Sequence, residues 1–317
     1  MKKLTRAETA EFLAAHDNYI ILTHARPDGD TIGSSAALCL GLRKLGKTAH
    51  VLKNREVSPR FRWLHEGLTT EKAEDTDCIL SVDVASPGIL QEDFKCLLGR
   101  IRLRIDHHSS ATSFTDFELV DAGSASCAEI IYDLLAQLNC PLDKTIAEAV
   151  YVGTSTDTGC FRYANTTAHT FSTAASCAQA GAEVYRLNME LFETNTMARL
   201  RMQGWIVEHM KLLAGGSMCV CPIPRQVEQD FGVTGDDMDN ISSFPRTVAG
   251  VRMAATLRQA ENGDVKLSVR AVPGCDATKI TVPFGGGGHK GAAGATMKMS
   301  LEEAALAVEK IMLEQLI

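Results

Sequence analysis

The chain has 317 residues, of which 45% are hydrophobic and 22% are charged, and its formal net charge is −7. This composition is ordinary for a soluble globular protein, and it excludes a disordered chain, a collagen-like chain or a coiled coil as the main architecture. The length predicts about two domains. The acidic balance and an aromatic content of 6% argue against binding to long duplex nucleic acid and against a broad base-stacking surface.

The N-terminus, Met-Lys-Lys-Leu-Thr-Arg-Ala-Glu, becomes acidic before any apolar stretch begins, so we expect no signal peptide. No run approaches the roughly 18 consecutive apolar residues that cross a bilayer, so we also expect no membrane partner. The ten cysteines are too sparse for a disulfide framework, and the closest pair, Cys219 and Cys221, lies in an apolar run typical of a buried strand. We therefore expect a cytoplasmic location with reduced thiols.

Strand and helix patterns alternate along the first half of the chain. Short apolar runs without a helical period predict buried strands, and longer runs with apolar residues on one face predict helices. The expected strands are 19–22, 49–52, 78–82 and 101–105, and the expected helices are 31–45, 126–139, 143–154 and 167–181. This alternation predicts an α/β fold in which helices cover both faces of a parallel sheet.

The second half has a different pattern. We expect strands at 217–222, 248–257 and 265–270, then a run of four glycines, and a C-terminal helix from Leu301. A polar stretch with helical propensity, and without a Gly/Ser linker, separates the two halves. We therefore expect one domain over 1–190, a helical connector over 190–205 and a smaller α/β domain over 205–317.

Side chains that bind metal ions cluster where the predicted elements of the first half end. In open α/β sheets, ligands bind at the carboxyl ends of the strands. The segment His24-Ala-Arg-Pro-Asp28-Gly-Asp30 follows the first strand, and its proline and glycine favour a turn. The other positions are Asp83 after 78–82, Asp106-His107-His108 after 101–105, and Asp157 at the end of an apolar helix pattern.

Each of these clusters alone has a simple structural interpretation, such as a capped turn or a satisfied polar loop. Together they supply five aspartates and three histidines. Carboxylate and imidazole ligands without thiolates suit Mn²⁺, Mg²⁺ or Fe²⁺. The number of carboxylates is sufficient for two cations, the arrangement used for phosphoester hydrolysis.

The glycine run, Gly285-Gly-Gly-Gly-His-Lys-Gly-Ala-Ala-Gly294, indicates a second binding element. Its backbone can approach a ligand closely, its N–H groups can bind an anion, and its small residues suit close helix packing. It fits neither a Walker A loop nor a dinucleotide-binding fingerprint. Arg270 and Arg258 are candidate phosphate contacts, although each alone is more typical of a charged strand surface. Arg270 is favoured because it lies at a strand end close in sequence to the glycines.

Taken in order, the motifs around His24, Asp83, His107 and Asp157 resemble the four motifs of the DHH phosphoesterases. The stretch Phe284-Gly-Gly-Gly-Gly-His-Lys-Gly-Ala-Ala-Gly resembles the signature of the associated C-terminal DHHA1 domain. The resemblance covers residues 10–315, and it implies that the first domain is the metal-binding catalytic domain and the second the substrate-binding domain. Two local stretches, 123–133 and 157–167, are similar to the subgroup of bifunctional oligoribonucleases and pAp phosphatases, although Ala271 stands where that subgroup usually has serine.

The resemblance implies two Mn²⁺ ions per chain, with Mg²⁺ as the alternative, in an active site in the interdomain cleft. By position, His24 and Asp28 would hold one ion, and Asp30, His107 and Asp157 would hold the other. Asp83 would bridge the two ions, and it and His108, near the substrate phosphate, are the expected catalytic residues. The expected substrate-binding residues of the second domain are Arg270, Gly286, Gly287, Gly288 and His289.

The implied activity is hydrolysis of short oligoribonucleotides, such as the linear dinucleotides pApA and pGpG, to mononucleotides. The same site would convert 3′-phosphoadenosine 5′-phosphate (pAp) to AMP. The expected partners are therefore short RNA or pAp, with no duplex DNA, and a homodimer is left open. The alternatives are a cyclic-dinucleotide (c-di-AMP) phosphodiesterase, a pyrophosphatase or exopolyphosphatase of the same superfamily, and a non-catalytic nucleotide-binding module.

Overall fold

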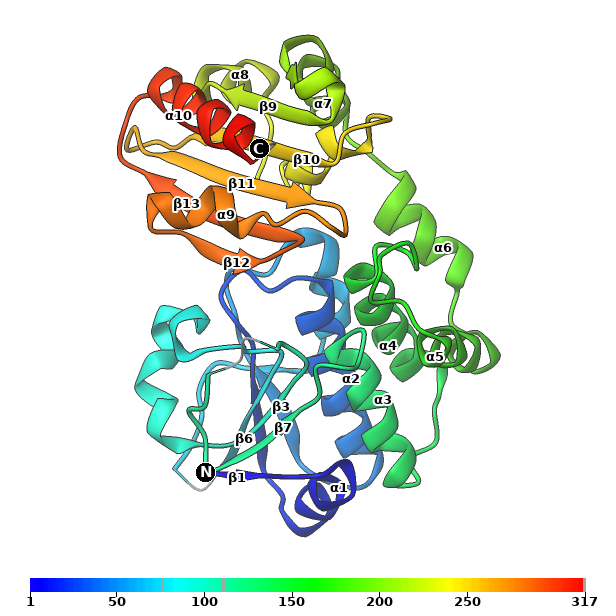
Figure 1. Ribbon diagram of the computed structural model, residues 1–317. Coiled ribbons are helices and arrows are strands. Elements are labelled where there is room, and N and C mark those ends of the chain that lie inside the picture. The colour runs from blue at the N-terminus through cyan, green and yellow to red at the C-terminus, as the bar shows by residue number, and fades with distance from the viewer. Residues whose placement is uncertain (76, 110–111, 316–317) are drawn as a thin grey trace. The chain divides into compact units, whose positions relative to one another are not determined.

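The computed structural model describes residues 1–75, 77–109 and 112–315 (Figure 1). The chain divides into two compact units, Met1–Thr194 and Asn195–Ile317, called unit 1 and unit 2 below. The division lies within the stretch 190–205, between a π-helical turn over Met189–Glu193 and helix α7 (Met197–His209). Helical residues thus lie on both sides of the division, and residues 194–196 between them are not helical.

Unit 1 is built on a parallel sheet whose strand order, within the described residues, is β1-β7-β6-β5-β2-β3-β4. The four predicted strands are confirmed at its centre, and β1, β4 and β7 are additional short strands. In the register of the sheet, Leu22 pairs with Ser81 and Val82 pairs with Ile105, so the carboxyl ends of β2, β5 and β6 lie side by side. The bounds are β1 Lys2–Lys3, β2 Tyr19–Leu22, β3 Ala49–Leu52, β4 Thr69–Thr70, β5 Cys78–Val82, β6 Ile101–Asp106 and β7 Phe117–Val120.

Alternate residues of each strand face opposite sides of this sheet. In β2, Tyr19 and Ile21 pack among the helices of one face, and Ile20 and Leu22 pack on the other face. Helices thus cover both faces, as predicted, but the second face carries 3-10 turns at Pro87–Ile89 and Glu92–Arg100 in place of α-helices. The helices of unit 1 are α1 Arg6–Ala15, α2 Gly29–Lys44, α3 Cys127–Gln137, α4 Lys144–Asp157, α5 Ala168–Gln179 and α6 Val184–Asn188, with a 3-10 helix at Pro59–His65.

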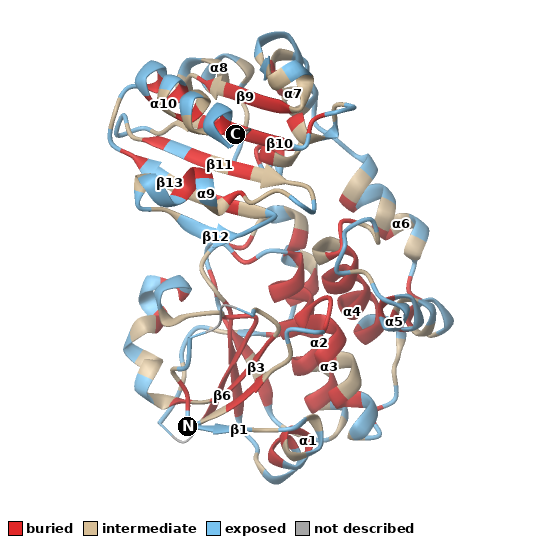
Figure 2. Ribbon diagram, viewed as in Figure 1, coloured by how far each residue is buried: buried red, intermediate tan, exposed pale blue. Residues whose placement is uncertain are grey.

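Helices α2, α3 and α4 are mostly buried, as Figure 2 shows. A Cβ atom on Gly33 of α2 would overlap the α4 backbone at Ala149 and Gly153, so glycine is what permits this close contact. On the α4 side, a Cβ on Gly153 would come within 2.9 Å of the Asp30 carboxylate. This packing fixes the first turn of α2 against the last turns of α4, and both turns carry predicted metal ligands.

Unit 2 contains a mixed sheet whose order, within the described residues, is β12-β13-β11-β10-β9-β8. Its β9 and β10 strands are parallel, and the other neighbours are antiparallel. Helix α10 packs on one face with Met253 and Leu267, and α7 packs on the other with Cys221 and Ile223. The bounds are β8 Lys211–Leu213, β9 Met218–Ile223, β10 Met253–Gln259, β11 Val265–Ala271, β12 Gly287–His289, β13 Ala292–Met297, α8 Arg225–Phe231, α9 Thr278–Thr281 and α10 Leu301–Glu314.

Two expectations for unit 2 were wrong. The run 248–257 becomes a strand only from Met253, because a turn closed by a hydrogen bond from the Val251 N–H to the Val248 carbonyl precedes it. The small residues after the glycines pack in strand β13 rather than against a helix, and part of the glycine run is itself strand β12. Pairing with β11 and β13 therefore overrides the low strand propensity of glycine and alanine.

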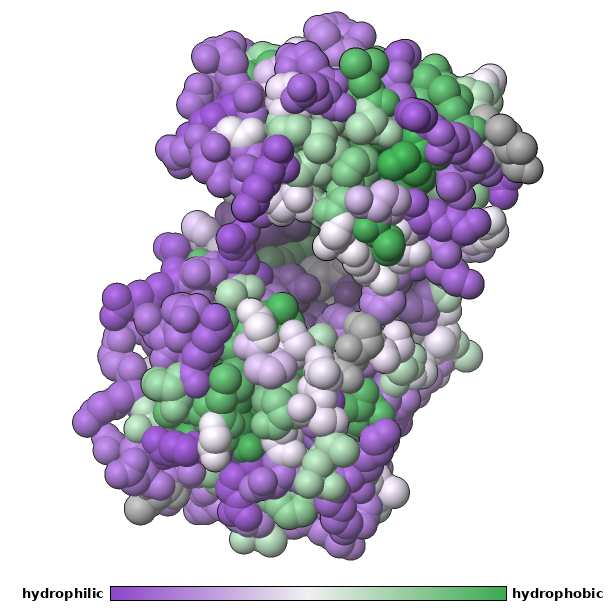
Figure 3. Space-filling view, turned by 60° about the vertical axis from the view of Figure 1, so that its left-hand side comes forward, coloured by the Kyte–Doolittle hydropathy of each residue, from purple (hydrophilic) through white to green (hydrophobic). Residues whose placement is uncertain are grey.

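The surface visible in Figure 3 is largely hydrophilic on both units, with patches of hydrophobic residues between the polar ones. Among the residues that the structure describes, no helix combines the length and the apolar character needed to cross a membrane.

Candidate metal centre

All six predicted metal ligands come together in unit 1. The loop from β2 to α2 carries His24, Asp28 and Asp30, while β5 is followed by Asp83 and β6 by His107, and α4 ends at Asp157. Their ligand atoms form groups within 4.8 Å of one another. The groups are His24–Asp28–Asp83 (the first group), Asp30–His107–Asp157 (the second group) and Asp83–His107–His108.

The first group is arranged around the Nε2 atom of His24. This atom lies 3.9 Å from Asp28 Oδ1 and 3.9 Å from Asp83 Oδ2. The other ring nitrogen, Nδ1, lies 2.7 Å from the Ala25 carbonyl oxygen, which accepts a hydrogen bond from the Nδ1–H and so leaves the Nε2 lone pair for a cation. Asp28 also caps α2, since its Oδ1 accepts a hydrogen bond from the Thr31 N–H at 3.0 Å.

The second group is arranged around the Nε2 atom of His107. It lies 3.7 Å from Asp30 Oδ2, 3.5 Å from Asp83 Oδ1 and 3.8 Å from Asp157 Oδ2. The buried Asp30 carboxylate accepts backbone N–H bonds from Cys127 at 2.7 Å and Ala128 at 2.9 Å. These donors belong to the first turn of α3, where the helix dipole also favours a negative charge.

Asp83 joins the two groups, because one of its oxygens faces His24 and the other faces His107. Its Oδ2 accepts a hydrogen bond from the Thr31 hydroxyl at 2.6 Å, whereas the buried Oδ1 has no hydrogen-bond partner among the described residues. A buried carboxylate oxygen without a donor is costly. The orphaned oxygen and the purely oxygen and imidazole donor set therefore fit divalent cations.

Burial and mutual repulsion dominate the electrostatics of the site. Burial, followed by the charge of neighbouring carboxylates, raises the pKa of Asp30, Asp83 and Asp157. Burial also opposes the charged form of His107, but the carboxylates around it together raise the pKa of that imidazole. Without a cation, the site thus favours bound protons, and bound cations would take their place.

His108 is held beside the two groups. Its Nδ1 lies 2.8 Å from Asp106 Oδ1, and this hydrogen bond is the largest cause that raises the pKa of His108. Asp106 is fully buried and lies near Arg104, which also contacts Glu118 at 3.2 Å. Because Nδ1 is engaged, Nε2 is the nitrogen that His108 can present to a substrate.

The structure also brings together the predicted substrate-binding residues within unit 2. Arg270 lies inside β11 rather than after its end, and it is in register with Ala292 of β13. His289 of the edge strand β12 is in register with the same Ala292 from the other side. Residues in register share a face of the sheet. Arg270 and His289 therefore flank a small side chain, with their backbones about 10 Å apart.

The glycine run is only partly available to a ligand. The N–H groups of Gly285 and Gly286 donate to carbonyls of α9 and of the turn after it, and Gly287 and Gly288 pair with β13. Gly287 and Gly288 are exposed and lie on the sheet edge. Arg258 is unavailable in a different way, because its guanidinium contacts both carboxylate oxygens of Glu228 at 2.8 and 3.0 Å.

Thr31, whose hydroxyl donates a hydrogen bond to Asp83, was not predicted from the sequence. The signal that could have identified it was its place directly after Asp30, in the first turn of the helix that follows the motif.

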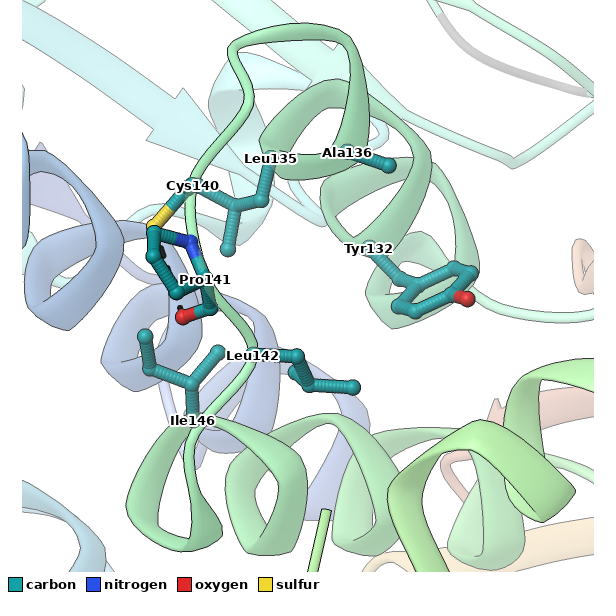
Figure 4. Close-up of a pocket in the computed structure, with 7 residues that line it drawn as sticks. All are labelled: Tyr132, Leu135, Ala136, Cys140, Pro141, Leu142 and Ile146. Carbon is teal, nitrogen blue, oxygen red and sulfur yellow. Dashed lines mark hydrogen bonds between the residues drawn. The ribbon is translucent and has the colours of Figure 1, made fainter. Parts of the chain in front are cut away.

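A small pocket of about 110 Å³ also lies in unit 1, between α3 and α4 (Figure 4). The pocket is lined by mostly apolar residues, namely Tyr132, Leu135, Ala136, Cys140, Pro141, Leu142 and Ile146. None of these is a candidate metal ligand, so the pocket is not part of this centre.

Carboxylates and imidazoles gathered at the carboxyl ends of parallel strands are typical of metal-dependent hydrolases, and this is the class that the fold and the site indicate. Residues 18–154 match the DHH family, N-terminal domain, and residues 215–314 match the DHHA1 domain. The chain belongs to this DHH family, with a DHHA1 domain, and it is a metal-dependent phosphoesterase.

Relatives of this chain agree with the family assignment. A bifunctional oligoribonuclease and PAP phosphatase NrnA from Thermus thermophilus is 33% identical over 93% of this chain and 89% of that protein. The protein of the same name from Bacillus subtilis is 26% identical over 92% of this chain and 93% of that protein. The fold also matches a crystal structure of an exopolyphosphatase-related protein from Bacteroides fragilis, with a TM-score of 0.85, 22% identity, and 98% and 95% of the two chains covered.

Proposed function

We propose that the protein hydrolyses short oligoribonucleotides, such as pApA and pGpG, to mononucleotides and pAp to AMP, with two Mn²⁺ ions. The observation that carries this proposal is the position of Asp83, whose two oxygens face two separate groups of ligands. The names of the NrnA relatives support the same two substrates.

Two bound divalent cations would supply a hydroxide near neutral pH and offset the charge of the phosphoryl oxygens. His24, Asp28 and Asp83 would hold one ion, and Asp30, His107, Asp157 and the shared Asp83 would hold the other. The His108 Nε2 atom, fixed by the contact of Nδ1 with Asp106, would donate a hydrogen bond to a phosphoryl oxygen.

Unit 2 would hold the other end of the substrate. Arg270 and His289 present cationic or hydrogen-bonding groups on one face of the sheet, and the exposed edge at Gly287 and Gly288 allows close approach of a phosphate. The formal net charge of −7 argues against duplex DNA, so short chains are the substrates in this proposal. A cytoplasmic location agrees with ten free cysteines.

The test is a substrate panel with Mn²⁺, in which pApA, pAp, c-di-AMP and pyrophosphate are incubated separately and the products are separated by chromatography. AMP from both pApA and pAp is the expected result. Asp83→Asn should abolish it, and because asparagine tolerates the left-handed backbone at this position (φ 56°), the variant keeps the local fold. Asp230→Asn, at an exposed site in unit 2, is the matched control.

Hydrolysis of pyrophosphate alone, or of c-di-AMP alone, would overturn the substrate assignment. An absence of any metal-dependent product would overturn the proposed function as a whole.

A further inference from the structure

We propose that two asparagines, Asn54 and Asn165, are positioning residues that each serve one of the two metal groups. The amide nitrogen of Asn54 donates to the His24 carbonyl, and that of Asn165 lies within hydrogen-bond distance of Asp157, so each acts through a candidate ligand that it holds. This inference rests on the proposed two-metal function.

Asn54 fixes the loop of the first group from the neighbouring strand. It lies just after β3, is buried, and its Nδ2 donates to the His24 carbonyl at 2.9 Å and to the Thr23 hydroxyl at 3.0 Å. Its Oδ1 accepts from the Glu56 N–H at 2.8 Å, and the Glu56 carboxylate in turn accepts from the Arg26 N–H at 2.9 Å. Every polar atom of the Asn54 amide is thus engaged in the segment that carries His24 and Asp28.

Asn165 holds the second group in a different way. Its Nδ2 lies 2.9 Å from the Ala125 carbonyl, 3.2 Å from the Asp157 carbonyl and 3.4 Å from Asp157 Oδ2. Ala125 immediately precedes the first turn of α3, whose N–H groups hold the Asp30 carboxylate. One amide therefore connects Asp157 to the turn that fixes Asp30, and both are ligands of the second group.

A strained turn brings Asn165 back to Asp157. Gly159, Cys160 and Phe161 follow the end of α4 with φ values of 57°, 59° and 62°. For cysteine and phenylalanine this left-handed backbone is unfavourable, and such strain persists where the surroundings enforce it. The Phe161 ring packs 5.8 Å from the Tyr151 ring and 5.6 Å from the Phe171 ring, which anchors the turn.

The hydrogen bonds of the two asparagines have no residue in common. Among the described residues, the Asn54 side chain forms hydrogen bonds only within the segment 23–56, and the Asn165 side chain forms them only with Ala125 and Asp157. Loss of either amide should therefore weaken one ion and leave the other nearly unchanged. A residue with a merely structural role would lower the stability of unit 1 and weaken both ions together.

The experiment is a titration with MnCl₂ in which free and bound Mn²⁺ are resolved by electron paramagnetic resonance. The wild type, Asn54→Ala and Asn165→Ala are compared with Asn188→Ala, a matched control that removes a single bond from the Tyr151 hydroxyl. We expect two bound ions in the wild type and an increase of about 10-fold in one dissociation constant for each of the two variants. Both constants should be unchanged in Asn188→Ala.

Double variants identify which ion each asparagine serves, because Asp28 belongs only to the first group and Asp157 only to the second. Asn165→Ala should weaken the ion that remains in Asp28→Asn and have no effect on the ion that remains in Asp157→Asn. Asn54→Ala should give the opposite result.

Two results would overturn the inference while leaving the proposed function intact. One is wild-type affinity for both ions in Asn54→Ala and Asn165→Ala, and the other is equal weakening of both ions by either variant. A wild-type protein that does not bind two Mn²⁺ ions would overturn the proposed function and this inference together.

Discussion

The two units hold their candidate functional residues in contrasting ways. In unit 1 the side chains of Asp30 and Asp83 are 2–3% exposed, and other parts of the fold hold these carboxylates with hydrogen bonds. In unit 2 His289 and two of the glycines are exposed on an edge strand.

This contrast matches the different demands of chemistry and binding. A site that gathers like charges must be built in advance, because each buried carboxylate is unfavourable until a cation arrives. A surface that grips the end of a substrate can remain open and still bind through backbone and cationic groups. Unit 1 therefore carries an electrostatic cost in its metal-free state, and unit 2 does not.

Asp83→Asn should have the largest effect. Loss of the shared carboxylate should lower kcat on pApA by at least about 100-fold. The same change removes one of the mutually repelling buried charges, so the melting temperature in EDTA should stay equal or rise. Activity and calorimetric unfolding together check this result. A variant that is both inactive and unstable in EDTA would contradict the electrostatic cost assigned to unit 1.

The metal-free protein should also lose stability as the pH rises. The pKa values of Asp30, Asp83 and Asp157 are raised in the folded state, mainly by burial. Their stabilising contribution is complete below the ordinary aspartate pKa and is lost as the pH climbs through the raised values, at up to about 1.4 kcal/mol per pH unit for each proton.

Thermal unfolding in EDTA between about pH 5 and pH 8 measures this loss, and excess Mn²⁺ should remove most of it. In Asp83→Asn, the melting temperature in EDTA should depend less on pH than in the wild type. A melting temperature in EDTA that increases over this range would show that the buried carboxylates of unit 1 are not the dominant titrating groups.

Two adjacent glycines, Gly286 and Gly287, test whether the open edge of unit 2 binds substrate. A Cβ on Gly287 would meet no atom within 4 Å, whereas a Cβ on Gly286 would overlap Gly294 and Ala295. Gly287→Ala should therefore leave the melting temperature unchanged and raise KM for pApA about 10-fold if a phosphate approaches this backbone. Gly286→Ala should instead destabilise unit 2. An unchanged KM in Gly287→Ala would remove this edge from the substrate grip.

The sequence predicted the centre of unit 1 well because buried strands carry an unmistakable apolar run. It missed β1 and β4, which are pairs of lysines and threonines at sheet edges, since edge strands of two residues have no such run. It also missed β12 and β13, whose glycines and alanines become strands through pairing of β13 with β11 and of β12 with β13.

The meeting of the candidate metal ligands in one place was predictable for a topological reason. Parallel strands end at one edge of the sheet, so aspartates and histidines that follow successive strands must meet there. Asn54 and Asn165 could not be recognised in the same way. Asn165 bonds to Ala125, 40 residues earlier, through an amide that gives no sequence signal, and only the folded turn brings the two together.

The smallest effect on stability and activity is expected for substitution of Arg258. Comparing it with Arg270 distinguishes an arginine with a structural role from one that binds substrate in unit 2. Its bidentate pair with Glu228 is partly exposed, with side-chain accessibilities of 36% and 19%, so Arg258→Gln should cost no more than about 1 kcal/mol of stability. KM for pApA should not change, because the guanidinium is already engaged. Arg270→Gln, measured beside it, should raise KM with little change in kcat. Equal KM values for the two variants would mean that the charged face around Ala292 does not bind substrate, and the grip of unit 2 would then depend on backbone groups alone.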